Sequence, residues 1–176
     1  MIKEFTININ EDQLTNIKSK VEHYPWSSIE NMKAWTYGTN KKYLKELCDY
    51  WLKEFNWKKH EQLINSFKNY KTNVDGIDIH FIKEEGSGEN PKTLLLLHGW
   101  PGSVVEFLEI IKPLAHPEKF GGNIDDAFTV IAPSLPGFGF SGAPKEPIGP
   151  RKISGILNKM MIENLNYKKY VAQGGD

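Results

Sequence analysis

The sequence predicts an α/β protein in which a helical N-terminal region precedes the first strands of a parallel sheet. In the first part of the chain, apolar residues recur at helical spacing. From about Lys71 onward, apolar residues alternate with polar ones or follow each other without a break. Stretches of helical periodicity separate the continuously apolar segments. This strand–helix–strand order is typical of parallel strands joined by right-handed connections.

The N-terminal region is expected to form three helices. Asn10 followed by Gln13 resembles a capping box, and apolar residues then recur at helical spacing until Pro25. Thr39 is expected to cap a second helix, and a third short helix is predicted over residues 57–67. The second helix has a broad, largely aromatic face, formed by Tyr43, Leu44, Leu47, Tyr50, Trp51 and Phe55.

The strands follow in order along the rest of the chain. Alternating apolar residues flank Asp75 and Gly76, which predicts a β-hairpin with a two-residue turn. The continuous apolar run at residues 93–97 is typical of a strand that is buried on both faces. Residues 128–132 form a second such segment, and residues 169–173 are the last predicted strand.

Two helices are expected between these buried strands. Ser103 and Glu106 have the spacing of a capping box, and the helix that follows is expected to bury Phe107, Leu108, Ile110, Ile111 and Leu114. Pro150 suits the first turn of the second helix, where a missing N–H costs nothing. The inner face of that helix is predicted to carry Ile153, Ile156, Leu157, Met160, Met161 and Leu165.

Composition excludes several classes of partner. The 22 Lys and Arg balance the 22 Asp and Glu, so charge favours neither nucleic acid nor an anionic membrane. A single cysteine, Cys48, cannot form an internal disulfide, and the chain opens with no signal peptide and contains no membrane-spanning run. We therefore expect a soluble, cytoplasmic protein. No metal-ligand spacing or cofactor motif is present, and no oligomeric state is predicted.

Residues 98–102 (HGWPG) follow the first buried strand, at the edge of the sheet where ligands bind in open α/β proteins. The backbone N–H of Trp100 could help to hold a developing oxyanion there. An ordinary turn that needs glycine only for its shape is the alternative. For His98 we expect a structural hydrogen bond rather than a role as general base.

Residues 133–142 (PSLPGFGFSG) form a second loop near the same edge. The loop lacks the pattern of a phosphate-binding loop. Ser134 and Ser141 have no neighbouring base in the sequence, so both are expected to be structural. The loop's two phenylalanines could line a pocket or simply pack. His80 and the exposed-looking His23, His60 and His116 show no pattern of partners.

The last residues, Gly174, Gly175 and Asp176, follow a predicted strand, as in the first half of a nucleophile elbow. Small residues before the nucleophile permit the sharp turn that exposes it. An aspartate there would attack a carbon electrophile and form an ester that water must then cleave. A loop at an arbitrary end of the chain is the alternative, but the two upstream loops favour chemistry at Asp176.

Taken together, these features resemble the epoxide hydrolases of the α/β-hydrolase superfamily, in particular the microsomal and juvenile-hormone branch. The resemblance covers the whole chain and rests on residues 35–38 (WTYG), 55–58 (FNWK), 75–82 (DGIDIHFI) and 98–103 (HGWPGS), together with the final Gly-Gly-Asp. Asn56 and Lys58 replace the usual Asp and Arg of the family, a departure without catalytic weight.

The resemblance implies that Asp176 is the nucleophile and that the N–H of Trp100 belongs to the oxyanion hole, beside a cis Trp100–Pro101 bond. It implies a small hydrophobic epoxide and water as reactants, a vicinal diol as product, and neither cofactor nor membrane anchor. In this family two lid tyrosines protonate the epoxide oxygen, and a histidine oriented by an acid activates water. We expect these partners, the lid and the C-terminal half of the sheet to lie outside this chain, which alone would then be inactive and poorly soluble.

The implied domains are an epoxide hydrolase N-terminal region over residues 1–111 and a partial α/β-hydrolase core over residues 112–176. Two alternatives to an epoxide hydrolase stay open at this point. A haloalkane dehalogenase would share the aspartate nucleophile, although we would not expect it to carry this long helical N-terminal region. A non-catalytic module that binds a hydrophobic ligand or a protein partner is the second alternative.

Overall fold

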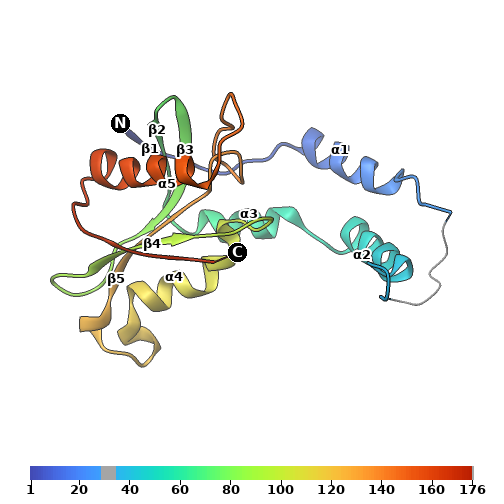
Figure 1. The fold of residues 1–176 in the computed structure, drawn as a ribbon. Helices are drawn as coiled ribbons and strands as arrows, with labels where there is room; N and C mark the ends of the chain where they lie inside the picture. The colour runs from blue at the N-terminus through green and yellow to red at the C-terminus, as the bar shows by residue number, and fades with distance from the viewer. Residues whose placement is uncertain (29–34, 176) are drawn as a thin grey trace. The chain divides into compact units, whose positions relative to one another are not determined.

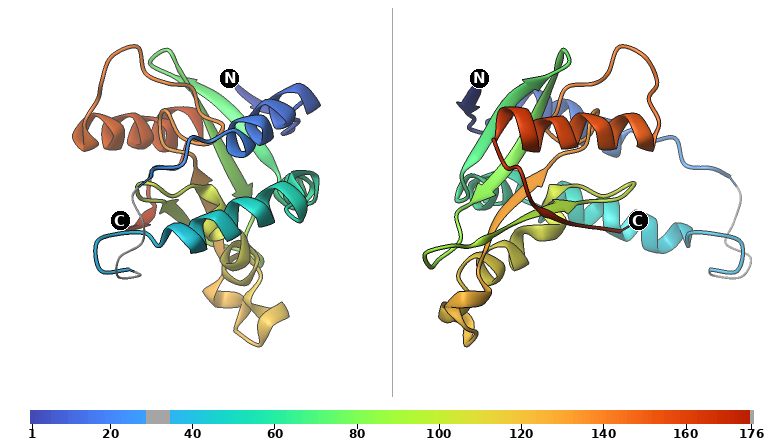
Figure 2. Two further views of the ribbon diagram at one scale, coloured as in Figure 1. Left: turned by 90° about the vertical axis from the view of Figure 1, so that its right-hand side faces the viewer. Right: turned by 60° about the vertical axis from the view of Figure 1, so that its left-hand side comes forward.

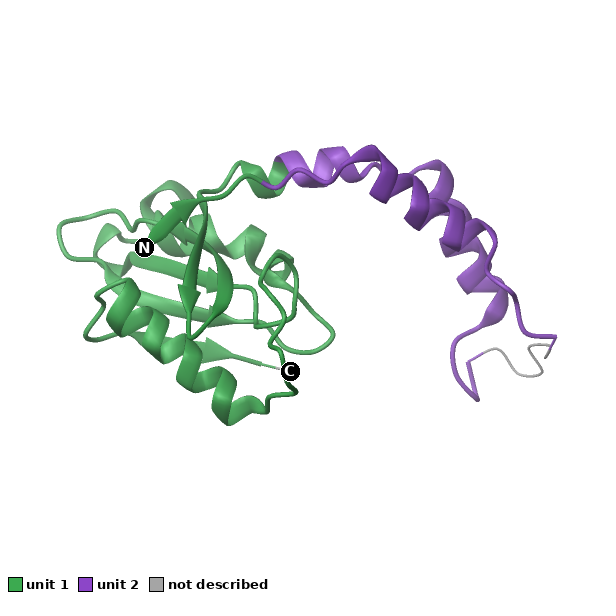
Figure 3. Cartoon of the chain, turned by 90° about the horizontal axis from the view of Figure 1, so that it is seen from above, with its two compact units in different colours: residues 1–6, 63–176 green, residues 7–62 purple. Residues whose placement is uncertain are grey.

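The computed structural model describes residues 1–28 and 35–175. The chain divides into two compact units (Figure 3): residues 7–62 form one, and residues 1–6 together with the chain from residue 63 onward form the other. Within the described ranges, no helix is long and apolar enough to cross a membrane.

Residues 7–62 contain the predicted helices, which are α1 (Glu11–Glu22), α2 (Lys41–Lys53) and most of α3 (Trp57–Asn65). The side chain of Asn10 caps α1 by accepting a hydrogen bond from the N–H of Gln13 (2.8 Å). The prediction that Thr39 caps α2 is wrong. Asn40 is the cap, because its side chain lies three residues before Tyr43 and accepts the hydrogen bond of that residue's N–H (3.1 Å).

The apolar face of α2 is only partly buried by the described residues. Tyr50 is 56% exposed and Trp51 41% exposed, and no residue of α1 or α2 is buried. The helical period is as predicted, but the burial that such a face usually brings is not found within the described part of the chain.

A buried carboxylate lies in the middle of α3. Glu61 is only 6% exposed and accepts hydrogen bonds from the N–H of Ile9 (2.7 Å), the indole of Trp57 (3.1 Å) and the ammonium group of Lys58 (2.9 Å). The bond from Ile9, followed by those from the two side chains, lowers the pKa of Glu61 below its usual value, although burial opposes the shift. The segment before α1 is thereby tied to α3.

The rest of the chain is built on a six-stranded mixed sheet with strand order β1-β2-β3-β5-β4-β6. β4, β5 and β6 are parallel, as predicted, whereas β1, β2, β3 and β5 pair antiparallel in turn. β1 was not predicted, since three residues carry too little periodicity to reveal a strand. The strands are β1 (Ile2–Glu4), β2 (Asn69–Val74), β3 (Ile77–Glu84), β4 (Lys92–Leu97), β5 (Phe128–Pro133) and β6 (Val171–Gly174).

The predicted hairpin joins β2 to β3. Asp75 and Gly76 have φ values of 50° and 84°, the two positive values that a type I′ turn requires. The hairpin and the parallel strands belong to one sheet, because β3 pairs with β5.

Helices cover both faces of this sheet: α4 (Leu108–Ala115) lies on one side and α5 (Pro150–Lys159) on the other (Figure 1, Figure 2). The chain passes from β4 to β5 in one direction and from β5 to β6 in the other, and right-handed connections then place the two helices on opposite faces. A 3₁₀ turn, η1 (Val104–Phe107), precedes α4, and the capping box predicted for Ser103 and Glu106 is present.

The alternating side chains of the strands supply two apolar layers. On the α5 side, the sheet residues Ile79, Phe81, Leu95 and Ile131 pack with the helix residues Ile156, Leu157, Met160 and Met161. Leu94, Leu96 and Val130 alternate with them and are also buried. Ile110 was predicted to be buried but is 43% exposed, because it lies about 100° around the helix from the buried Ile111.

We expect Glu61→Gln to lower the free energy of unfolding by about 1.5–3 kcal/mol at pH 7, since an amide cannot accept all the hydrogen bonds that the carboxylate receives. Glu61 has a lowered pKa in the folded chain, so its contribution is complete above the unfolded pKa, near 4.5, and is lost as the pH falls below it. Urea unfolding followed by circular dichroism at pH 7 and pH 4 measures both effects. Glu46→Gln, on the exposed surface of α2, is the control, and equal stability of the two variants would contradict the assignment.

Candidate active site

Three chain segments come together at the carboxyl ends of the parallel strands. β4 leads into residues 98–102, β5 leads into residues 134–142, and β6 ends at Gly174. β4 lies between β5 and β6, so the connections on its two sides run in opposite directions. In open α/β sheets this arrangement marks the edge where ligands bind.

β6 brings the end of the described chain to the last residue of β4. Gly174 pairs with Leu97, directly before His98. A Cβ atom on Gly174 would lie 3.2 Å from the Cβ atom of Leu97, so the close approach of the two strands favours glycine. Asp176, the predicted nucleophile, comes two residues later and lies outside the described residues.

Trp100 lies in the turn after β4, with its side chain 73% exposed. The peptide bond between Trp100 and Pro101 is cis, as the family resemblance implies. The turn is followed by the capped η1 helix. Its position next to the end of β6 agrees with a role for the Trp100 N–H in an oxyanion hole, which remains a prediction.

His98 has the structural role expected of it. The ring is almost completely buried, and its Nε2 accepts a hydrogen bond from the N–H of Leu135 (3.1 Å). Nε2 therefore carries no proton, and Nδ1–H donates to the carbonyl of Gly99 (3.0 Å). His98 thus joins the turn after β4 to the loop after β5.

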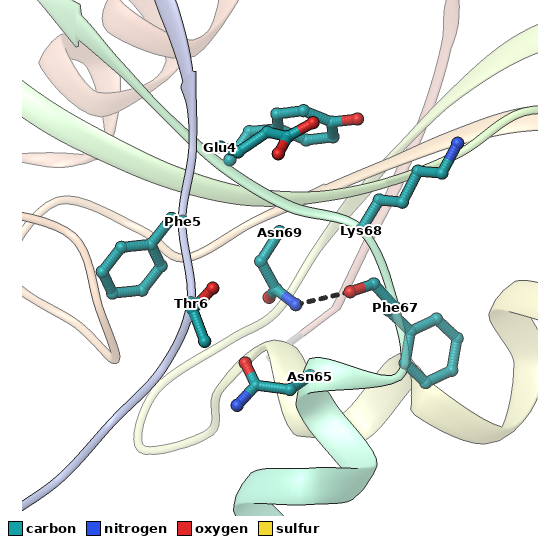
Figure 4. A pocket seen from close by; sticks show the side chains of 8 residues that line it. Glu4, Phe5, Thr6, Asn65, Phe67, Lys68 and Asn69 are labelled. Atoms are coloured by element: carbon teal, nitrogen blue, oxygen red, sulfur yellow. Dashed lines mark hydrogen bonds between the residues drawn. The ribbon is translucent and has the colours of Figure 1, made fainter.

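The sequence shows no pattern of partners for His80, but the structure gives its ring two. The ring is fully buried, with Nε2 2.9 Å from Oδ1 of Asn69 and Nδ1 2.9 Å from Oγ of Ser134. The amide nitrogen of Asn69 already donates to the carbonyl of Phe67 (Figure 4). It also donates to the carbonyl of Ile64, and the two bonds identify Oδ1 as the acceptor. Hence Nε2 of His80 carries the proton, and Nδ1 accepts one from Ser134.

Burial keeps His80 uncharged. The loss of solvation, with a smaller contribution from the positive charge of Lys71, lowers the pKa of His80 from 6.5 to about 3. The apolar residues Ile79, Phe81 and Ile82 beside His80 are the sequence signal that could have revealed a satisfied core histidine.

Further contacts hold the loop that follows β5. The hydroxyl of Ser141 donates to the carbonyl of Ser134 (2.7 Å) and accepts from the N–H of His80 (2.9 Å). The ring of Phe138 packs edge-on against His98, and that of Phe140 packs edge-on against His80. Ser134 and Ser141 are therefore structural, as predicted, although Ser134 does have a histidine partner.

Gly139 allows the loop to turn back over this cluster. Its φ of 51° lies in the left-handed region, and a Cβ atom would lie 2.7 Å from the hydroxyl oxygen of Ser134. Among the residues that the structure describes, no cluster of His, Cys, Asp and Glu could hold a metal ion.

We expect Gly139→Ala to destabilise the chain by about 1–3 kcal/mol, because of its strained backbone and its contact with the buried Ser134 hydroxyl. The matched control is Gly155→Ala in α5, where the added Cβ would point into open space. That substitution should stabilise the helix by about 0.5–1 kcal/mol. Thermal unfolding of both variants tests the assignment, and a Gly139→Ala variant as stable as Gly155→Ala would disprove it.

The lowered pKa of His80 predicts acid sensitivity. Below pH 6.5 the unfolded chain binds a proton at His80 that the folded chain does not bind until about pH 3. This group alone should cost about 2 kcal/mol of stability between pH 8 and pH 5. Urea unfolding at both values should therefore show a smaller loss in His80→Gln, while the exposed-site control His23→Gln keeps the wild-type difference. An unchanged difference in His80→Gln would refute the prediction.

Comparison with known proteins agrees with this arrangement. Residues 2–107 match the family model "Epoxide hydrolase N terminus", and residues 92–176 match "alpha/beta hydrolase fold". The chain is 37% identical to juvenile hormone epoxide hydrolase 1 of Ctenocephalides felis and 35% identical to epoxide hydrolase 1 of Oryctolagus cuniculus. Each alignment covers 99% of this chain, but only 38% and 39% of those relatives, respectively.

Two solved structures resemble the whole chain. The juvenile hormone epoxide hydrolase of Bombyx mori has a TM-score of 0.84 at 33% identity, with 42% of its own chain covered. The epoxide hydrolase of Aspergillus niger has a TM-score of 0.84 at 29% identity, with 46% covered. Since the first family model spans more than half of the sequence, the chain belongs to the epoxide hydrolase N-terminus family.

Proposed function

We propose that this chain carries the nucleophile and an oxyanion-hole donor of an epoxide hydrolase, which converts an epoxide and water to a vicinal diol. The pairing of Gly174 with Leu97 carries the proposal, because it brings the residues before Asp176 to the edge that also bears Trp100. Family membership supports the reaction class.

In the first half-reaction, the Asp176 carboxylate attacks one epoxide carbon. The carbon–oxygen bond breaks, the ring oxygen takes up a proton, and an ester forms on Asp176. In the second half-reaction, water adds to the ester carbonyl while the N–H of Trp100 stabilises the oxyanion. The acyl–oxygen bond then breaks, the diol leaves and the carboxylate is restored. A small hydrophobic epoxide and water suffice, and no cofactor takes part.

The match over residues 2–107 favours an epoxide hydrolase over a haloalkane dehalogenase, for which this N-terminal region is not expected. We assign no residue of this chain as the base, as its orienting acid or as a proton-donating tyrosine. The chain spans about two fifths of its relatives' length. A domain boundary between residues 111 and 112 and a cytoplasmic location stay predictions.

Incubation with styrene oxide tests the role of Asp176. Because no residue of this chain is assigned as the base, we expect no diol turnover from the wild-type chain but an adduct of one styrene oxide on the Asp176 peptide, detected by mass spectrometry. Asp176→Asn should abolish this adduct, because an amide is a far weaker nucleophile than a carboxylate. The surface variant Asp12→Asn serves as the control. Equal adduct formation in Asp176→Asn, or no adduct on the wild-type chain, would contradict the proposal.

A further inference from the structure

A serine, a histidine and two glutamates form a second hydrogen-bonded cluster at the amino-terminal ends of β4 and β5. Ser87 lies in the loop before β4, His116 follows α4, and Glu84 ends β3. The edge that bears Trp100 lies at the other end of β4, about 20 Å away along a strand of six residues. The cluster is therefore separate from the site proposed for epoxide hydrolysis.

The hydrogen bonds of His116 select its tautomer. Nε2 lies 2.9 Å from Oε1 of Glu84, and Nδ1 lies 2.6 Å from Oγ of Ser87. A carboxylate only accepts hydrogen bonds, so Nε2 carries a proton, and in the neutral ring the lone pair of Nδ1 is left for the Ser87 hydroxyl. A hydroxyl, a base that can take its proton and an acid that orients the base are the parts of an activated nucleophile. In serine proteases Nε2 faces the serine and Nδ1 faces the acid, whereas in this cluster Nδ1 faces Ser87 and Nε2 faces Glu84.

The backbone holds Ser87 firmly in this position. Its N–H donates to the carbonyl of Ala115 (2.8 Å). A Cβ atom on Gly86 would lie 2.7 Å from the carbonyl carbon of Phe128, and Gly88 has a φ of 84°. Both positions next to Ser87 therefore favour glycine. Small residues flanking a nucleophilic serine are typical of tight catalytic turns.

A cavity of about 350 Å³ lies beside Ser87, which is one of its lining residues. Its lining includes Gly88, Ile124 and the acidic residues Glu89 and Asp125. This volume suits a small ligand. The two carboxylates favour a neutral or positively charged ligand over an anion.

Glu118 offers the Ser87 hydroxyl a second acceptor. Its Oε1 lies 3.0 Å from Oγ of Ser87, compared with 2.6 Å for Nδ1 of His116. The hydroxyl has one proton, so these two groups compete for it. Glu118 is exposed, and water competes for its carboxylate, which favours the shorter bond to His116.

We propose that Ser87 is a second nucleophile, which accepts acyl groups from small neutral or cationic esters. Oγ of Ser87 attacks the ester carbonyl carbon while its proton passes to Nδ1 of His116. The carbon–oxygen bond to the alcohol breaks, and the alcohol leaves with that proton. Water, deprotonated by the same nitrogen, then cleaves the acyl-serine, which releases the carboxylic acid and restores Ser87. Glu84 orients His116 and stabilises the imidazolium that forms.

A fluorophosphonate probe, which phosphonylates activated serines, tests this proposal without an epoxide. The whole chain is treated with the probe, and the modified residue is identified by mass spectrometry of its peptides. We expect one adduct, on Ser87. His116→Gln should lower the labelling rate about 10²-fold, the usual contribution of a general base. Glu84→Gln should also lower the rate, whereas Glu118→Gln should not, because it only weakens the competing acceptor.

Two controls distinguish a loss of labelling caused by the missing partner from one caused by misfolding of a variant. Ser154→Ala removes an exposed hydroxyl of α5 and should label at the wild-type rate. Wild-type chain unfolded in urea contains the same serine without its partners and should lose the label. An unmodified Ser87 in the native chain, equal labelling in urea, or equal labelling of a folded His116→Gln variant would each overturn the proposal. None of these outcomes bears on Asp176.

Discussion

The loop after β5 is held at the carboxyl edge of the sheet by two buried histidines that contact its consecutive residues Ser134 and Leu135. The rings use opposite tautomers: Nε2 carries the proton in His80, and Nδ1 carries it in His98. Every ring nitrogen of the pair has a hydrogen-bond partner. A second proton on either ring would therefore bury a charge, and on His98 it would also break the bond from the N–H of Leu135, which can only donate.

This constraint connects parts of the sequence that lie far apart. Asn69 begins β2, His80 lies in β3, and His98 follows β4, yet all three contribute to the order of one loop. The N-terminal hairpin therefore takes part in shaping the edge where the parallel strands end. Together with the close contact between Gly174 and Leu97, these bonds organise the surroundings of the proposed nucleophile.

The two proposed nucleophiles differ in what the fold must supply. A carboxylate such as Asp176 is already ionised at neutral pH and needs a sharp turn and an oxyanion donor. A serine hydroxyl needs a base within hydrogen-bonding distance, and His116 meets this need for Ser87. The two proposed sites, at opposite ends of β4, therefore depend on different features. The site proposed at Asp176 depends on backbone geometry, and the site proposed at Ser87 depends on a chain of side-chain hydrogen bonds.

The sequence alone determined the local features of this protein: the helices, the Asp75–Gly76 turn, the capping box at Ser103 and the three parallel strands. These follow from periodicity, turn chemistry and capping, which act over a few residues. Tertiary structure decided the partners of His80 and His116, the exposure of Ile110 and the addition of β1 to the sheet. Each of these depends on residues that the fold brings together from 11 to 70 positions apart or on the side of a helix that meets the sheet, and no local pattern encodes such neighbours.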